Sequence, residues 1–258
     1  MAIFTSKVLW IVGMTDHQTE DGLLQRALTT GIGTVCVRST NERLPAAIAR
    51  FHENGIKVYA WRWPAVRPTT GVPHYFAPDE ADYVVDKLIS AGLDGYIADP
   101  ESDTAGDVND WNDSSLASLA KAFCERIRSG ATAAGLSTFR IGLTSGCTYP
   151  NHGMRPHIPW REFVDGSDVL LPQSYWRVAG GSANGGNPQK AIDRGLTSWG
   201  TIANGKPIVP MAGELERVTA EEISAYGTEM QAKGITEGHF YTDTTGVSAT
   251  VWTAIAAL

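Results

Sequence analysis

Short apolar runs alternate with amphipathic segments along the whole chain, and this alternation constrains the fold more than any other feature of the sequence. The runs have the length of strands buried in a parallel sheet, and the segments between them carry apolar residues at helical spacing. The expected strands cover residues 8–13, 34–38, 57–63, 95–99, 140–144, 169–175, 207–211 and 239–242. The expected helices cover residues 22–30, 44–54, 79–91, 114–134, 160–164, 188–197, 220–233 and 249–256.

Eight strands that alternate with eight helices predict an α/β fold, a single (β/α)8 barrel formed by residues 1–258. Glycines after several expected helices, such as Gly31 and Gly55, are typical of helix C-terminal caps. An open, doubly wound sheet is the alternative. It would be expected to carry a Gly-rich phosphate loop after an early strand, and neither GxGxxG nor GxxxxGK[ST] occurs in the sequence.

The connections between these elements indicate where a functional site would lie. In barrels of this kind the catalytic groups are carried by the loops that follow the strands. The expected loops at residues 64–78, 101–112, 145–159 and 176–187 are long, whereas most connections on the other rim are shorter. Loop length concentrated on one rim predicts a site at the carboxyl ends of the strands.

The fourth expected strand ends in two carboxylates, Asp99 and Glu101. Because side chains alternate along a strand, both are expected on one face, roughly 7 Å apart along the backbone. Pro100 between them has no N–H for a ladder and marks the end of the strand. Crowded carboxyls resist ionising together, and an acid beside a carboxylate is what glycoside cleavage requires. We therefore predict Glu101 and Asp99 as catalytic residues; the other interpretation is that they cap the following turn.

Further polar side chains are expected at the same rim. Gln173 and Tyr175 share one face of the sixth strand, where they would hydrogen-bond a substrate or a developing charge. Glu214 follows the seventh strand, Tyr241 ends the eighth, and Asp243 lies two residues beyond it. We predict that Tyr175 and Asp243 belong to the catalytic group. Gln173, Glu214 and Tyr241 are predicted to bind substrate.

Aromatic residues also gather near this rim. Trp61, Trp63 and Trp176 are predicted to bind substrate, because flat aromatic faces suit the apolar C–H faces of sugar rings. Arg38, at the end of the second strand, is predicted to join them. Trp10 is interpreted instead as a core residue.

Composition restricts the partners. A net charge of −7 argues against nucleic acid and anionic membranes as main partners. The carboxylates and aromatic residues expected at the rim predict a polysaccharide substrate, and no cofactor or metal is expected. The apolar runs are too short to span a bilayer. No cleavage site follows the first of them, so the protein is expected to be cytoplasmic as synthesised and to reach a cell wall by another route. Three cysteines without CxxC spacing predict reduced thiols.

The D-x-E of residues 99–101, which follows Gly95-Tyr96-Ile97, and the Gln-x-Tyr of residues 173–175 resemble glycoside hydrolase barrels that cleave next to N-acetylhexosamines. The pattern is similar to the family 25 lysozymes of phage endolysins and bacterial autolysins. It is also similar to chitinase-like barrels, which have a D-x-E on the fourth strand and a Tyr on the sixth. The resemblance implies that Glu101 is the general acid and base, that Asp99 stabilises the acetamido oxygen of the substrate as nucleophile, and that Tyr175 holds the acetamido group.

Three functional hypotheses follow. The first is a retaining glycoside hydrolase on an N-acetylhexosamine-containing polysaccharide, with peptidoglycan as the expected substrate of a lysozyme-like muramidase. The second is a catalytically silent, carbohydrate-binding or structural barrel, such as a component of a phage tail, injection apparatus or secretion assembly. The third is a metal-dependent barrel hydrolase whose ligands would be Asp99, Glu101, Glu214 and Asp243.

Overall fold

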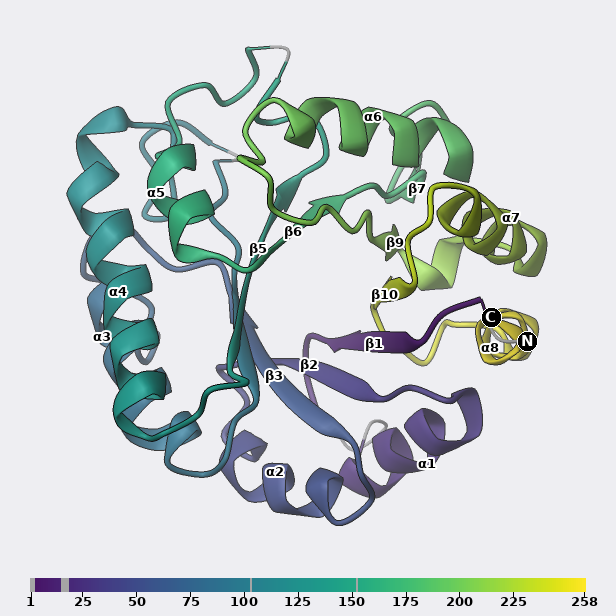
Figure 1. Cartoon of the computed structure of the whole chain (residues 1–258), viewed down its shortest axis with the longest axis horizontal. Helices are drawn as coiled ribbons and strands as arrows, with labels where there is room; N and C mark the ends of the chain where they lie inside the picture. The colour runs from purple at the N-terminus through teal and green to yellow at the C-terminus, as the bar shows by residue number, and fades with distance from the viewer. Residues whose placement is uncertain (1–2, 15–18, 103, 152) are drawn as a thin grey trace.

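The computed structural model describes residues 3–14, 19–102, 104–151 and 153–258. Within these residues eight parallel strands form a nearly closed barrel, which confirms the predicted (β/α)8 fold. Helices surround the strands as an outer ring (Figure 1). The barrel strands are β1 (Ser6–Ile11), β2 (Thr34–Arg38), β3 (Lys57–Arg62), β4 (Gly95–Ala98), β5 (Arg140–Gly146), β6 (Val169–Gln173), β9 (Ala212–Gly213) and β10 (Glu237–Tyr241).

The barrel closes between β6 and the segment before β9. The strand order is β6-β5-β4-β3-β2-β1-β10-β9, and an isolated bridge between Leu170 and Ile208 joins its two ends. Pro207 and Pro210 have no N–H to donate, so this segment cannot form a continuous ladder. Residues 207–211, expected as the seventh strand, therefore form only the bridge at Ile208, and the two-residue β9 follows them.

The helices mostly lie where the periodicity predicts them. They are α1 (Glu20–Thr30), α2 (Leu44–His52), α3 (Ala77–Tyr83), α4 (Ala117–Ala133), α5 (Trp160–Gly166), α6 (Pro188–Gly200), α7 (Ala220–Ala232) and α8 (Ala249–Ala257). A π-helical stretch, η1 (Val84–Ile89), extends α3, and single 3₁₀ turns form at η2 (Ser114–Leu116) and η3 (Leu215–Arg217). Side chains cap several helix starts, and Thr219 forms a capping box with Glu222 at the start of α7.

The long loops on the carboxyl rim contact one another. The Val66 N–H donates to the Val108 carbonyl (2.7 Å), which joins the β3 loop to the β4 loop. The His157 N–H donates to Asn112 Oδ1 (2.9 Å), which joins the β5 loop to the β4 loop. The loop after β6 instead folds into a hairpin of β7 (Arg177–Val178) and β8 (Gly181–Ser182). Three successive loops thus form one connected wall.

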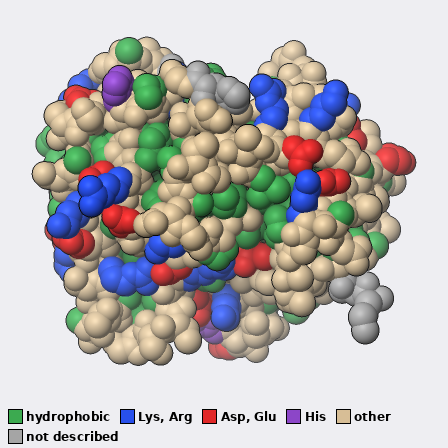
Figure 2. Space-filling model, turned by 45° about the horizontal axis from the view of Figure 1, so that its top comes forward, with side chains coloured by type: hydrophobic (Ala, Val, Ile, Leu, Met, Phe, Trp, Pro, Cys, Tyr) green, Lys and Arg blue, Asp and Glu red, His purple; other side chains and the backbone are tan. Residues whose placement is uncertain are grey.

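Charged side chains cover the outside of the barrel as pairs of opposite sign. Arg126 on α4 contacts Asp82 (2.7 Å) and Asp86 (3.3 Å) on the neighbouring helical segment. On the face in Figure 2, acidic and basic side chains lie beside each other rather than in separate patches. Among the residues described, no helix is both long and apolar enough to cross a membrane. The three cysteines are buried and form no disulfide.

The two ends of the chain lie side by side next to α8 (Figure 1). The Phe4 N–H donates to the Leu258 carbonyl (2.9 Å), which ties the segment before β1 to the end of the last helix. The Lys7 ammonium adds a second tie, because it donates to the carbonyls of Thr30 (3.1 Å) and Ile255 (2.8 Å). The barrel is thus fastened where its first and last elements meet.

Gly95, at the start of β4, offers a test of packing inside the barrel. A Cβ there would lie 2.7 Å from the Tyr59 ring and 2.7 Å from the Arg140 carbonyl oxygen. We predict that Gly95→Ala lowers the free energy of unfolding by about 1–3 kcal/mol, because the interior cannot take up the added methyl without displacing its neighbours. Urea denaturation measures the change. Gly33→Ala is the matched control, since a Cβ there has no atom within 4 Å; equal midpoints for both variants would contradict the packing argument.

Candidate active site

A cavity of about 480 Å³ opens at the carboxyl ends of the strands, on the rim that the loop lengths predict. It combines carboxylates, amides, tyrosines and tryptophans contributed by β1, β3, β4, β6, β9, β10 and the loops that follow them. The lining residues are Trp10, Trp61, Trp63, Asp99, Glu101, Asn109, Gln173, Tyr175, Glu214 and Tyr241.

Asp99 and Glu101 both face this cavity, as the two-residue spacing predicts. The amide nitrogen of Gln173 on β6 donates to Asp99 Oδ1 and to Glu101 Oε1, each at 3.0 Å. An amide nitrogen carries two hydrogens, so both bonds form at once. Asp99 is buried, whereas Glu101 is partly exposed. Gln173 therefore holds two carboxyls at a fixed separation, with Glu101 the more accessible of the two.

The backbone around the carboxylates is also fixed. The Asp99 N–H donates to the Arg62 carbonyl (2.9 Å), and the Trp111 N–H donates to the Glu101 carbonyl (3.0 Å). The Ser145 hydroxyl on β5 donates to the Pro100 carbonyl (2.7 Å). These bonds continue the barrel pairing past the last residue of β4.

Two tyrosines line the cavity beside the carboxylates. The rings of Tyr175 and Tyr241 are stacked, with centroids 5.3 Å apart and an interplanar angle of 14°. Burial, then the neighbouring Tyr241, Asp99 and other acidic groups, raise the pKa of Tyr175 well above its ordinary value. Burial and the charges of Asp99 and Glu214 raise the pKa of Tyr241 to about 12, although Arg38 opposes them. Both hydroxyls therefore stay protonated at neutral pH and can donate hydrogen bonds.

Three tryptophans form the aromatic side of the cavity. Trp61 lies between Trp10 and Trp63, with ring centroids 5.4 and 5.2 Å away. The Trp61 indole donates to the Ile11 carbonyl (3.1 Å), which fixes its ring. Trp10, interpreted from the sequence as a core residue, is indeed almost fully buried, but it forms part of the cavity lining. Asn109 was also missed, because it lies inside a long loop without a periodic pattern.

A chain of polar groups supports Trp10, and of these groups His239 is buried while Glu237 and Arg140 are partly buried. Its indole N–H donates to His239 Nδ1 (3.1 Å), and His239 Nε2 contacts Glu237 Oε1 (2.6 Å). Arg140 on β5 donates to the other Glu237 oxygen (2.7 Å). An indole N–H is only a donor, so His239 Nδ1 must be the acceptor and Nε2 must carry the proton. His239 is thus a neutral imidazole that links Glu237 to Trp10, so the position of Glu237 helps to fix an indole of the cavity lining.

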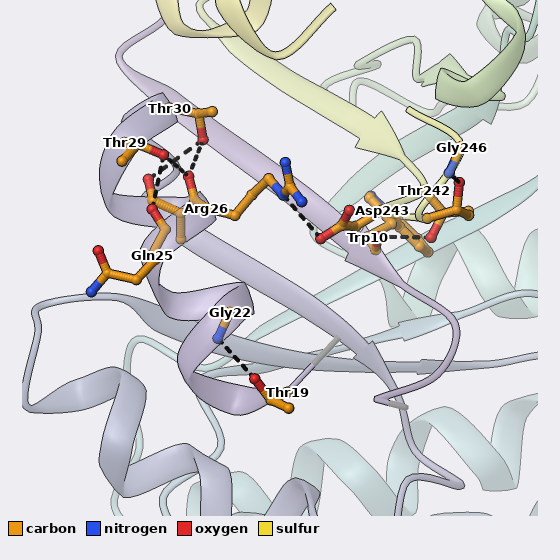
Figure 3. A network of polar contacts seen from close by, with 12 residues as sticks. Trp10, Thr19, Gly22, Gln25, Arg26, Thr29, Thr30, Thr242, Asp243 and Gly246 are labelled. Carbon is orange, nitrogen blue, oxygen red and sulfur yellow. Dashed lines mark hydrogen bonds and ion pairs between the residues drawn. The ribbon is translucent and has the colours of Figure 1, made fainter. Parts of the chain in front are cut away.

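Two predicted site residues do not reach the cavity. Trp176 is completely buried and stacks on Tyr226 of α7 (5.8 Å between centroids), because the residue after Tyr175 points to the other side of the chain. Asp243 lies on the outside of the strands, where its carboxylate contacts Arg26 Nε of α1 (3.4 Å; Figure 3). These placements correct the expectations that Trp176 binds substrate and that Asp243 is catalytic.

The remaining predicted residues lie at the cavity or at its border. Glu214 lines the cavity and forms an ion pair with Arg217. Arg38 stands beside the lining, with its guanidinium carbon 5.5 Å from the centroid of the Trp63 ring. The peptide bonds Gly213–Glu214 and Tyr241–Thr242, at the ends of β9 and β10, are cis.

The four carboxylates of the metal hypothesis are not gathered at one point. Asp243 faces α1 rather than the cavity that contains Asp99, Glu101 and Glu214. Within the described ranges, no three His, Cys, Asp or Glu side chains are grouped so that they could hold a metal ion.

A larger cavity of about 590 Å³ lies outside the barrel, between α4 and α5. Its charged side chains largely neutralise one another, as in the pair of Arg128 and Asp168 (2.7 Å). Chemistry rather than size therefore identifies the rim cavity as the candidate site.

Known proteins resemble this chain in structure only. No protein-family model and no curated protein matches its sequence. A family 18 chitinase from Pseudoalteromonas aurantia is 13% identical, with a TM-score of 0.64 over 98% of this chain and 100% of that one. A chitinase from Chromobacterium violaceum is 10% identical, with a TM-score of 0.63 over 96% and 97%.

The spore cortex-lytic enzyme SleL from Bacillus cereus is 9% identical, with a TM-score of 0.63 over 100% of this chain and 75% of that one. At these identities the likeness shows a shared barrel fold. The neighbours are glycoside hydrolases, but they do not show the expected resemblance to family 25 lysozymes.

The chain of polar groups that supports Trp10 predicts a pH-dependent contribution to stability. Burial opposes ionisation of Glu237, but the imidazole N–H of His239 and the Arg140 guanidinium outweigh it and lower the pKa of Glu237 below its ordinary value of 4.5. In this acidic range the unfolded chain then binds more protons than the folded chain, so the stabilisation is present above pH 4.5 and is lost as the pH falls below it.

We predict that Glu237→Gln lowers the free energy of unfolding at pH 7 by about 1.5–3 kcal/mol, because the partly buried Arg140 loses its charged hydrogen-bond partner. The difference in the free energy of unfolding between the variant and the parent protein should become smaller between pH 5 and pH 2. Chemical denaturation at several pH values measures it, with the exposed Glu125→Gln as the control. If this difference in the free energy of unfolding stays constant over the range, His239 and Arg140 do not stabilise the ionised form of Glu237.

Proposed function

We propose that this protein is a glycoside hydrolase that cleaves an N-acetylhexosamine-containing polysaccharide. The observation that carries the proposal is the placement of Asp99 and Glu101 in one cavity, bridged by Gln173. Paired carboxylates are the shared equipment of most glycosidases. The chitinases and the cortex-lytic enzyme with the same barrel support this class of substrate.

The lining of the cavity suits a sugar with an acetamido group. Its volume falls within the ordinary range for small-molecule sites, and indole faces such as that of Trp61 pack against pyranose C–H groups. The hydroxyls of Tyr175 and Tyr241 are donors that would hold a carbonyl oxygen. The acidic lining favours a substrate that is neutral at the bond to be cleaved.

In the proposed reaction, protonated Glu101 gives its proton to the glycosidic oxygen as the bond from that oxygen to C1 breaks. Gln173 donates to Oε1 of Glu101 and so orients the carboxyl group that makes this transfer. The acetamido oxygen of the same sugar forms a bond to C1 from the opposite face, which produces a cyclic oxazolinium ion. Asp99 stabilises the positive charge near the acetamido nitrogen, and Tyr175 donates to the acetamido oxygen as the sugar is aligned.

Water then completes the reaction. The Glu101 carboxylate takes a proton from the water as its oxygen bonds to C1, and the C1 bond to the acetamido oxygen breaks. The product sugar keeps the configuration of the substrate at C1, and Glu101 is again protonated. Asp99 and Glu101 therefore carry different roles in one cycle.

Peptidoglycan is the substrate we propose within this class, which would make the protein a muramidase-like cell-wall enzyme. The SleL neighbour, described as a spore cortex-lytic enzyme, supports a cell-wall substrate. A phage or secretion system that delivers such an enzyme to the wall remains part of this proposal.

We predict that Glu101→Gln lowers kcat on N-acetylhexosamine polymers by about 10²–10⁴-fold, because the amide cannot supply the proton. Release of reducing ends from purified peptidoglycan and from chitin oligomers measures the rate. Glu125→Gln, on the exposed face of α4, is the matched control and should retain parental activity. Unchanged activity of Glu101→Gln, with the same melting temperature as the parent, would remove Glu101 from the mechanism.

A further inference from the structure

The guanidinium of Arg38 stands at the border of the cavity. Arg38 ends β2 on the same rim as the carboxylates, and it is partly buried. Across the residues the structure describes, no carboxylate lies within ion-pair distance of its guanidinium, and its buried Nε atom has no hydrogen-bond partner. Arg217, Arg140 and Arg26 are paired with Glu214, Glu237 and Asp243. Arg62, which ends the neighbouring strand β3, is buried and has a nitrogen, Nη1, without a hydrogen-bond partner among the described residues.

Burial and a neighbouring cation make the charged form of Arg38 less stable than it would be in water. Burial lowers its pKa, and so does the positive charge of Arg62. A guanidinium that has lost part of its hydration and faces another cation is stabilised by an added anion. Its face contact with Trp63 holds the group in place without neutralising it.

The position of Arg38 is that of a group that contacts a bound polymer. It lies beside Trp63, which lines the cavity, and it influences the pKa of Tyr241 on the opposite side of β1. The carboxylates within the cavity would repel an acidic sugar, so a cation at the border is needed if such a sugar is to bind there. The planar guanidinium fork matches a carboxylate in a way that a lysine does not.

We propose that Arg38 binds a carboxylate of the substrate saccharide and makes the site selective for acidic N-acetylhexosamine polymers. This inference rests on the proposed function and refines its substrate. The carboxylate is either that of the lactyl group of a muramic acid residue without a stem peptide or that of a uronic acid. A neutral polymer such as chitin would leave Arg38 unpaired.

The experiment compares four soluble oligomers of equal length. They are peptide-free peptidoglycan glycan with its lactyl carboxylates, the same glycan with those groups converted to neutral amides, N-acetylglucosamine oligomers, and an oligomer that alternates N-acetylhexosamine with uronic acid. The readout is the ratio of kcat/KM between acidic and neutral members. Tryptophan fluorescence titration gives the matching ratio of Kd values, because three indoles line the cavity.

We predict that the parent protein prefers an acidic oligomer over its neutral form by about 10- to 100-fold, the effect of one charge-assisted hydrogen-bonded contact. Arg38→Gln should remove this preference, and Arg38→Lys should keep part of it. Arg161→Gln is the control for net charge, because Arg161 is highly exposed on α5. The oligomer that shows the effect, lactyl or uronic, identifies the source of the carboxylate.

Two outcomes overturn the inference while the proposed function stands. Either the parent cleaves acidic and amidated glycans equally well, or Arg38→Gln lowers kcat/KM for both by the same factor, as a purely structural role would. Cleavage of none of the oligomers would instead reject the proposed function. In that case the ratio of Kd values for acidic and neutral oligomers tests whether Arg38 binds a carboxylate. If no oligomer binds, both the proposed function and the role of Arg38 are rejected.

Discussion

The ion pair between Arg140 and Glu237 is the contact on which the interior of the barrel depends. β5 and β10 are separated by four strands in the sheet order, so the pair joins opposite sides of the barrel. Both oxygens of Glu237 are used, one by Arg140 and the other by His239. Because His239 then presents a bare nitrogen to Trp10, the charge at the base of the barrel determines how an indole is held at its mouth.

Much of the fold follows from the sequence because local and tertiary requirements agree. Strand β2 was predicted residue for residue, since its apolar run is bounded by turn residues and buried on both sides. The seventh strand was not, because Pro207 and Pro210 prevent ladder pairing although the run is apolar. The π-helical stretch after α3 and the β7–β8 hairpin carry no periodic signal that separates them from an ordinary helix or loop.

The residues of the candidate site also fall into those that local strand geometry predicts and those that depend on contacts distant in the sequence. The alternation of side chains placed Asp99, Glu101 and Gln173 together, because strand geometry extends just past the end of β4 and Gln173 is the last residue of β6. It failed for Asp243, whose direction depends on Arg26, a residue 217 positions earlier in the chain. Trp10 shows a different limit: a residue can be buried and still line a cavity, and composition alone does not distinguish these.

The cross-bonded loops after β3, β4 and β5 have a consequence for how such a barrel diversifies. Backbone and side-chain bonds couple these three loops, so an insertion in one would disturb the others. The glycine-rich hairpin after β6 is less tightly coupled to these loops. At its tip, a Cβ added at Gly180 or Gly181 would have no atom within 4 Å. An insertion that lengthens this hairpin would therefore disturb the three coupled loops less than an insertion within any one of them.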